Sequence, residues 1–279
     1  MNLQQLTTRI ADSPPPKLDE HILKSYSALR WIMTGLSFAL PLLLVVGGLN
    51  SWWWISAPLE AQNSLSAYYH AGSQCTAFAG VYRDLFVGIL TAIGFCLIIY
   101  AGFGRLENWL LNVAGICLMG VAFFPMGWTE QQMIPACSQE AFEGFISSKL
   151  LGTSLSIHFA SAILFFLTIT LVNVLTAMDT VKAITDFKKK RFWQNVFRYA
   201  RFLMPISLGF VLLLRLFTGT SVVGDRFVLW LEWFGIWAFS FYWLLKSIEI
   251  LTTKIDLDAI NGSLQWNRSN NQQILQKRK

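Results

Sequence analysis

The chain has 279 residues, of which 54% are hydrophobic and only 14% are charged, whereas soluble domains carry about 25% charged side chains. This composition excludes disordered, collagen-like, coiled-coil and disulfide-stapled proteins. The 12 Trp and 22 Phe residues exceed what a soluble core of this size can bury, so we expect a polytopic membrane protein.

Six stretches are apolar and long enough to cross a bilayer, which takes about 20 residues of helix. Because backbone groups in lipid must be satisfied within their own segment, each stretch is predicted to be a helix. The predicted fold is an all-α bundle of six transmembrane helices in residues 31–250, between an N-terminal segment (1–30) and a polar tail (251–279). The predicted spans are residues 31–49, 84–100, 109–126, 152–176, 202–217 and 227–245.

Most of the 22 Lys and Arg residues fall in residues 1–30, 101–108, 177–201 and the chain from Lys246 onward. Cytoplasmic connections carry an excess of these residues, so both termini are predicted to be cytoplasmic. The net charge of +6 is then explained by topology, and no nucleic-acid partner is expected.

The first long external connection (50–79) carries Ser66 and His70, the second span opens with Asp84, and the fourth contains His158. From these positions the three side chains of His70, Asp84 and His158 could converge as a three-ligand zinc site, with water in the fourth position. Ser66 would donate a hydrogen bond to the developing oxyanion. The alternative is that the histidines are hydrogen-bonded packing residues and that Asp84 begins a helix or pairs with Arg83.

The order Ser66-x3-His70 and then Asp84 resembles the Ser-x3-His…Asp signature of the CREST membrane hydrolases, which include alkaline ceramidases and adiponectin-receptor-like proteins. The resemblance covers only residues 66–84. It implies a zinc protein that hydrolyses lipid amides, with Ser66 and Asp84 as catalytic residues and His158 as a later ligand. The patterns Ser-x-Tyr-Tyr and Arg-Asp-x-Phe-Val-Gly are also similar to uncharacterised bacterial membrane proteins, which implies the bacterial inner membrane and no particular activity.

Cysteine positions agree with this topology. Cys75 and Cys137 fall in the two long external connections, where disulfides persist, and we expect a bridge that ties both connections into one external cap. The alternative is a pair of free thiols that never meet. Cys96 and Cys117 lie within spans, where a free thiol acts as a small apolar residue.

Residues 186–200 read as a basic amphipathic helix in the headgroup region. Anionic lipid is the expected partner of its Lys188, Lys189, Lys190 and Arg191. The alternative is a connector whose positive charge only sets the membrane topology and needs no such lipid.

Two further charged residues lie inside the predicted spans. Arg215 and Glu232 stand at similar depths on a helical hairpin, which predicts either an interhelical ion pair or an Arg215 side chain that extends to the membrane surface. The alternative is a role in conduction or proton movement.

Two functions remain open at this stage. The first is an integral membrane sensor, ligand-binding or assembly component with a disulfide-tied external cap. The alternative is a zinc-dependent hydrolase of lipid-like amides or esters with its site at the external leaflet. A transporter ranks third, because few charged residues lie inside the spans.

Overall fold

The computed structural model describes residues 18–49, 61–71, 80–126, 156–218 and 226–253. Over these residues the chain forms helices and turns and no β-sheet, which confirms the predicted all-α class. Six helical stretches are long and apolar enough to cross a membrane, so the protein is a multi-pass membrane protein. These stretches are Lys24–Val46, Val81–Ile99, Arg105–Phe123, Ile157–Ala183, Phe187–Phe217 and Phe227–Thr253.

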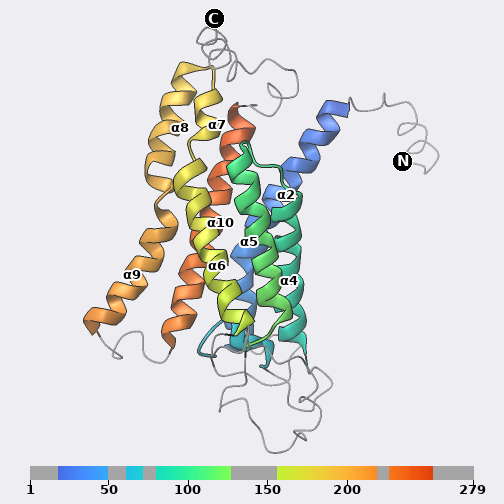
Figure 1. Ribbon diagram of the computed structural model, residues 1–279, viewed down its shortest axis with the longest axis vertical. Helices are drawn as coiled ribbons and strands as arrows, with labels where there is room; N and C mark the ends of the chain where they lie inside the picture. The colour runs from blue at the N-terminus through green and yellow to red at the C-terminus, as the bar shows by residue number, and fades with distance from the viewer. Residues whose placement is uncertain (1–17, 50–60, 72–79, 127–155, 219–225, 254–279) are drawn as a thin grey trace, which may run out of the picture.

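The long helices pack side by side in a bundle (Figure 1). In chain order the elements are α2 (Leu18–Pro41), the π-helix η1 (Leu42–Val46), α3 (Gly47–Leu49), the 3₁₀ helix η2 (Ser66–Tyr69), α4 (Val81–Ile99), α5 (Arg105–Phe123), α6 (Ile157–Leu171), the π-helix η6 (Val172–Thr176), α7 (Asp179–Ala183), α8 (Phe187–Ala200), α9 (Leu203–Thr218) and α10 (Phe227–Thr253).

The described chain enters and leaves the bundle at the same end, because α2 begins where α10 finishes (Figure 1). The short turn between α4 and α5 lies at this end too. The opposite end contains η2, the start of α4, the end of α5 and the start of α10. An even number of crossings agrees with two termini on one side; that this side is the cytoplasm remains a prediction from the Lys and Arg bias.

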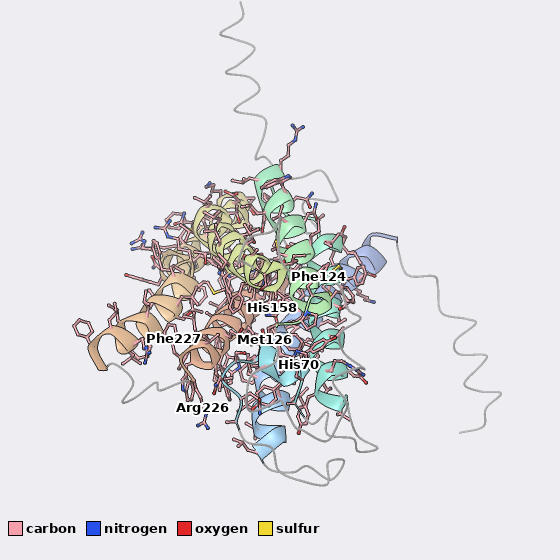
Figure 2. All side chains as sticks on the ribbon, turned by 60° about the horizontal axis from the view of Figure 1, so that its bottom comes forward. His70, Phe124, Met126, His158, Arg226 and Phe227 are labelled. Carbon is pink, nitrogen blue, oxygen red and sulfur yellow. The ribbon has the colours of Figure 1, made fainter. Side chains whose placement is uncertain are left out.

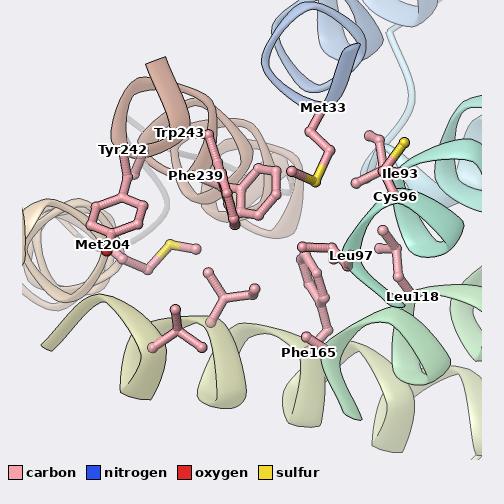
Figure 3. Packing of buried hydrophobic residues seen from close by; sticks show 14 of the residues in the cluster. Met33, Ile93, Cys96, Leu97, Leu118, Phe165, Met204, Phe239, Tyr242 and Trp243 are labelled. Carbon is pink, nitrogen blue, oxygen red and sulfur yellow. The ribbon is translucent and has the colours of Figure 1, made fainter. Parts of the chain in front are cut away.

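Large apolar side chains cover the outside of the bundle as well as its interior. Ile116 on α5, Ile163 on α6 and Phe210 on α9 are 63%, 60% and 51% exposed. A soluble protein rarely exposes such a continuous apolar surface, whereas lipid accepts it. Inside, Met33, Leu97, Phe165 and Phe239 come from four different helices and meet at the centre (Figure 3).

The ends of the predicted elements differ from the structure in one important respect. The prediction ends the last span at residue 245 and counts Lys246 among the cytoplasmic Lys and Arg residues, but α10 continues to Thr253. Lys246 is only 1% exposed and Glu249 is fully buried. The charges are tolerated there because they bind each other and a neighbouring helix, which sequence hydropathy does not register.

The predicted amphipathic helix over residues 186–200 is confirmed as α8. Asp186 caps its start by accepting hydrogen bonds from the amides of Lys188 and Lys189. Trp193 and Phe197 are buried. Instead of crossing the end of the bundle, α8 runs alongside it and leads directly into α9 (Figure 1).

The cysteines in the spans behave as expected, since Cys96 and Cys117 are free and buried. Cys75 and Cys137 lie outside the described residues, so the bridge between them stays a prediction.

Helices α4 and α5 approach closely at Gly94 and Gly115. A Cβ atom added at Gly115 would meet the Gly94 carbonyl oxygen at 2.6 Å. We therefore expect Gly115→Ala to lower the free energy of unfolding by about 1–3 kcal/mol, because the two backbones must separate. Denaturation with sodium dodecyl sulfate, followed by circular dichroism, measures this change.

Gly88→Ala is the matched control on α4, because a Cβ atom at Gly88 meets nothing within 4 Å. It should be neutral or stabilising by up to about 1 kcal/mol, the ordinary helix preference of Ala over Gly. Equal destabilisation by both substitutions would contradict the close packing of α4 on α5.

Candidate functional site

A buried, largely irregular segment closes one end of the bundle. Residues 61–71, which we call the plug, contain the single 3₁₀ turn of η2, and the side chains of Ser64, Ser66, Tyr68 and His70 within it are buried. Backbone that is not in an α-helix is tolerated at membrane depth only when protein surrounds it and satisfies its polar groups. The contacts of the plug therefore decide how this end is closed.

Glu232, in the second turn of α10, provides the main anchor of the plug. Its Oε2 accepts a hydrogen bond of 2.6 Å from the Leu65 amide, and its Oε1 accepts one of 3.1 Å from the Ser66 hydroxyl. The Leu229 amide, one turn earlier, donates to the Asn63 carbonyl at 3.0 Å.

The sequence-based prediction pairs Glu232 with Arg215, and the structure corrects the partner. Both Glu232 oxygens face the plug instead, while Arg215 lies in the last turn of α9. Depth on a hairpin predicts which residues lie at one level of the membrane. It does not predict which of two neighbours, α9 or the plug, a side chain of α10 faces.

Two buried histidines bind the same short segment that follows α5. His70 Nε2 lies 2.7 Å from the Met126 carbonyl oxygen, and His158 Nδ1 lies 2.9 Å from that of Phe124. Since a carbonyl only accepts, each of these ring nitrogens carries the proton. Figure 2, which brings this end forward, shows the two rings on either side of Met126.

Burial lowers the pKa of His70, and the hydrogen bond to Met126 opposes part of that shift. The Tyr68 hydroxyl, 3.4 Å from the Gln62 amide nitrogen, is also shielded, and burial raises its pKa. Both groups are therefore held in their neutral forms at neutral pH. These side chains pack and position the plug as uncharged hydrogen-bonding groups.

Asp84 lies away from both histidines. It stands in the first turn of α4, pairs with Arg83 at 3.2 Å, and has a side chain that is 73% exposed. Within the described ranges, no three His, Cys, Asp or Glu side chains are grouped closely enough to hold a metal ion. The predicted zinc centre of His70, Asp84 and His158 is thus not assembled, because Asp84 faces solvent while both imidazoles face inward.

Ser66 and His70 are separated for a local reason. On an α-helix, residues four apart share a face. In a 3₁₀ helix each residue advances the chain by about 120°, so residues four apart point about 120° away from each other. Ser66 therefore faces Glu232, whereas His70 faces Met126. The proposed catalytic pair of Ser66 and Asp84 is not brought together either.

A small cavity lies directly beneath the plug. Its volume is about 40 Å³, and it is bounded by α2, α4, α5, α6, α10 and the plug. The walls are mainly aliphatic and aromatic, including Phe86 and Phe165, and the polar side chains on the wall are Ser37, Ser66 and Glu232. The sequence singles out Glu232 as an ionisable residue inside a span, but nothing in the hydropathy pattern predicts a cavity next to it.

These features define a multi-pass membrane protein whose described residues form six membrane-spanning helices around a plugged, apolar cavity. No family model, curated protein or solved structure matches the chain. The likeness to the CREST hydrolases therefore remains a resemblance carried by residues 66–84.

The plug should loosen in acid because of His70. Its pKa in the folded protein lies below the ordinary 6.5, so the unfolded chain takes up this proton first as the pH falls. The free energy of unfolding should then decrease below about pH 6.5. His70→Gln keeps an N–H donor for the Met126 carbonyl but does not titrate. The substitution should therefore remove the part of the acid-induced loss in unfolding free energy that comes from His70.

Thermal unfolding of the detergent-purified protein, measured between about pH 7.5 and pH 5, tests this expectation. His158→Gln serves as the comparison, since it leaves the His70 component in place. An identical acid loss in the parent and in His70→Gln would contradict the neutral, buried state of His70.

Proposed function

We propose that this protein binds a small amphiphilic ligand in the cavity beneath the plug, and that it does so in the bacterial inner membrane. The single observation that supports the proposal is an apolar cavity with one carboxylate, Glu232, in its wall. Ligand sites are commonly apolar concavities with a few placed polar groups that fix orientation. Of the sensor, ligand-binding and assembly roles that the sequence leaves open, this arrangement favours ligand binding.

The chemistry of Glu232 defines the polar end of the ligand. An ionised carboxylate offers about four acceptor positions, and the plug takes one from Leu65 and one from Ser66. The positions that remain accept a hydroxyl, an amide N–H or an ammonium group. The ligand is therefore a hydrogen-bond donor at one end and apolar at the other.

The size of the cavity limits the apolar end. A water molecule needs about 10–15 Å³ on this scale, so 40 Å³ holds about three water-sized groups. A short alkyl chain or the end of a longer one fits without displacing the plug. The hydrolase alternative receives no such support, because Asp84 is exposed and separate from His70 and His158.

Anionic lipid at α8 is a second part of the proposal, in a narrower form than the sequence predicts. Lys189 donates to the Thr252 carbonyl at 2.8 Å, and Lys190 donates to the Lys182 carbonyl at 2.9 Å. Both ammonium groups are therefore already bound to backbone carbonyls in the last turns of α10 and α7. Lys188 and Arg191 are exposed. We assign headgroup binding to these two cations.

Filling the cavity tests the ligand proposal directly. Ala162 lines the cavity from α6, so Ala162→Leu should abolish binding of short linear primary amines and alcohols. Ala160→Leu is the matched control, since Ala160 is on the same helix but not on the cavity wall. Isothermal titration calorimetry with butylamine and butanol in detergent measures the affinity.

Glu232→Gln should weaken butylamine about tenfold or more while changing butanol less, because hydrogen bonds to charged groups are worth about 1.5–3 kcal/mol. Equal binding by the parent and Ala162→Leu would contradict a ligand in this cavity. Loss of binding in Ala160→Leu as well would show that the loss does not depend on filling the cavity, and would contradict the proposal equally.

A further inference from the structure

The helices that enclose the cavity beneath the plug pack closely around most of its circumference. Neighbouring backbones come together between α10 and α2, between α2 and α4, between α4 and α5, and between α5 and α6. Helices α6 and α10 both line the cavity, but within the described residues their backbones scarcely approach each other. We call the place where these two helices meet the seam, and it consists of Phe165 and Phe166 on α6 and of Gly235 and Phe239 on α10. At the seam, side chains alone complete the cavity wall.

Aromatic rings fill the seam. The ring centre of Phe165 lies 6.1 Å from that of Phe239, and Figure 3 shows both side chains extending into the space between the two helices. A Cβ atom added at Gly235 would come 2.6 Å from the Phe166 ring and 3.1 Å from Leu208 of α9, so Phe166 lies directly over this glycine. Phe166 also lines the cavity. Since Gly235 has no side chain of its own, the Phe166 ring closes the cavity wall at this level.

The outer surface beside the seam is apolar. Ile163 and Leu167 on α6 are 60% and 51% exposed, and Phe234 on α10 is 36% exposed. Helix α9 packs on α10, but its end at Thr218 lies away from α6 (Figure 1). Lipid accepts such a surface, so the seam faces the hydrocarbon part of the bilayer.

The plug closes the other route to the cavity, from the end of the bundle where α10 begins. Its hydrogen bonds to Glu232 and Leu229 of α10 must break before it can leave. A phenylalanine side chain has no hydrogen-bond donor or acceptor of this kind, so rotation of the Phe166 ring breaks no such bond. A molecule that starts in the bilayer therefore reaches Glu232 more easily through the seam than through the plug.

Along α10, the polar and apolar parts of the site lie in the order that a bilayer amphiphile requires. Glu232 stands in the second turn, near the plug, and Gly235 lies about 4.5 Å and Phe239 about 10 Å further along the helix at its rise of about 1.5 Å per residue. An amphiphile in a leaflet has its polar head near the membrane surface and its chain directed toward the midplane. A head bound at Glu232 thus directs its chain past Gly235 and Phe166.

We propose that the ligand is a single-chain amphiphile of the bilayer, which enters through the seam past Phe166 and keeps the far part of its chain in the lipid beside α9. This route rests on the proposed binding at Glu232 and narrows it: the ligand comes from the membrane, its head is a primary amine or alcohol, and its chain is longer than the cavity. A volume of about 40 Å³ holds only the first carbons of such a chain. The remainder leaves at the seam, where rotation of one ring opens the wall.

Photolabelling of the full chain in lipid nanodiscs tests this route. The probe is dodecylamine with a diazirine near the middle of its chain, and tandem mass spectrometry locates the labelled residues. We expect labelling of Leu208, which lies at the seam, and loss of this label in Ala162→Leu, because the filled cavity no longer holds the amine head. Leu213, which is 52% exposed on α9, is the control, since free probe in the lipid should label it equally in both proteins.

Equal labelling of Leu208 in the parent and in Ala162→Leu would overturn the seam route. So would a label on plug residues 61–71, in place of Leu208, that depends on the cavity. In either case, butylamine binding by the parent would leave the proposed ligand site intact, whereas absence of butylamine binding would contradict the proposed function and the seam route together. If Ala162→Leu does not fold, excess butylamine replaces it, because butylamine should compete for Glu232 and remove the Leu208 label while sparing Leu213.

Discussion

Both oxygens of Glu232 accept hydrogen bonds from residues 65 and 66, and this contact explains how an irregular segment is kept inside a membrane bundle. Groups that leave water must be satisfied by the protein, and a 3₁₀ turn of four residues cannot do this for a whole segment. The Leu229 amide and the imidazole of His70 supply further bonds. The cavity beneath the plug exists because α10 holds the plug above the apolar side chains of the core.

Helix α10 has polar anchors at both of its ends. Near its start, Glu232 binds the plug; near its finish, Lys246 and Glu249 bind Thr180 of α7. Between them the helix presents Phe239 and neighbouring apolar residues to the core. Helix α10 therefore connects two polar contacts through an apolar middle, and each contact fixes a different neighbour.

The fold could be predicted because length and hydropathy identify a membrane-spanning helix in the sequence. All six of the helices that the structure shows to be long and apolar enough were expected. The site could be predicted only in part. Ser66, His70, His158 and Glu232 do lie at one end of the bundle, but their partners depend on a 3₁₀ turn and on which face of α10 points inward. Lys246 and Glu249 were missed because hydropathy treats a charge as exposed, whereas here each charge carries its own counterion.

Cysteine accessibility tests the central contact most directly. Ala67 in the plug is fully buried, and Asp84 at the same end is exposed. In a chain whose four native cysteines are replaced by Ala, reconstituted in nanodiscs, we expect a polar maleimide to label Asp84→Cys and to leave Ala67→Cys unreacted. Adding Glu232→Ala should make Ala67→Cys reactive. Labelling of Ala67→Cys as fast as Asp84→Cys while Glu232 is present, or continued protection after its removal, would contradict a plug held by this carboxylate.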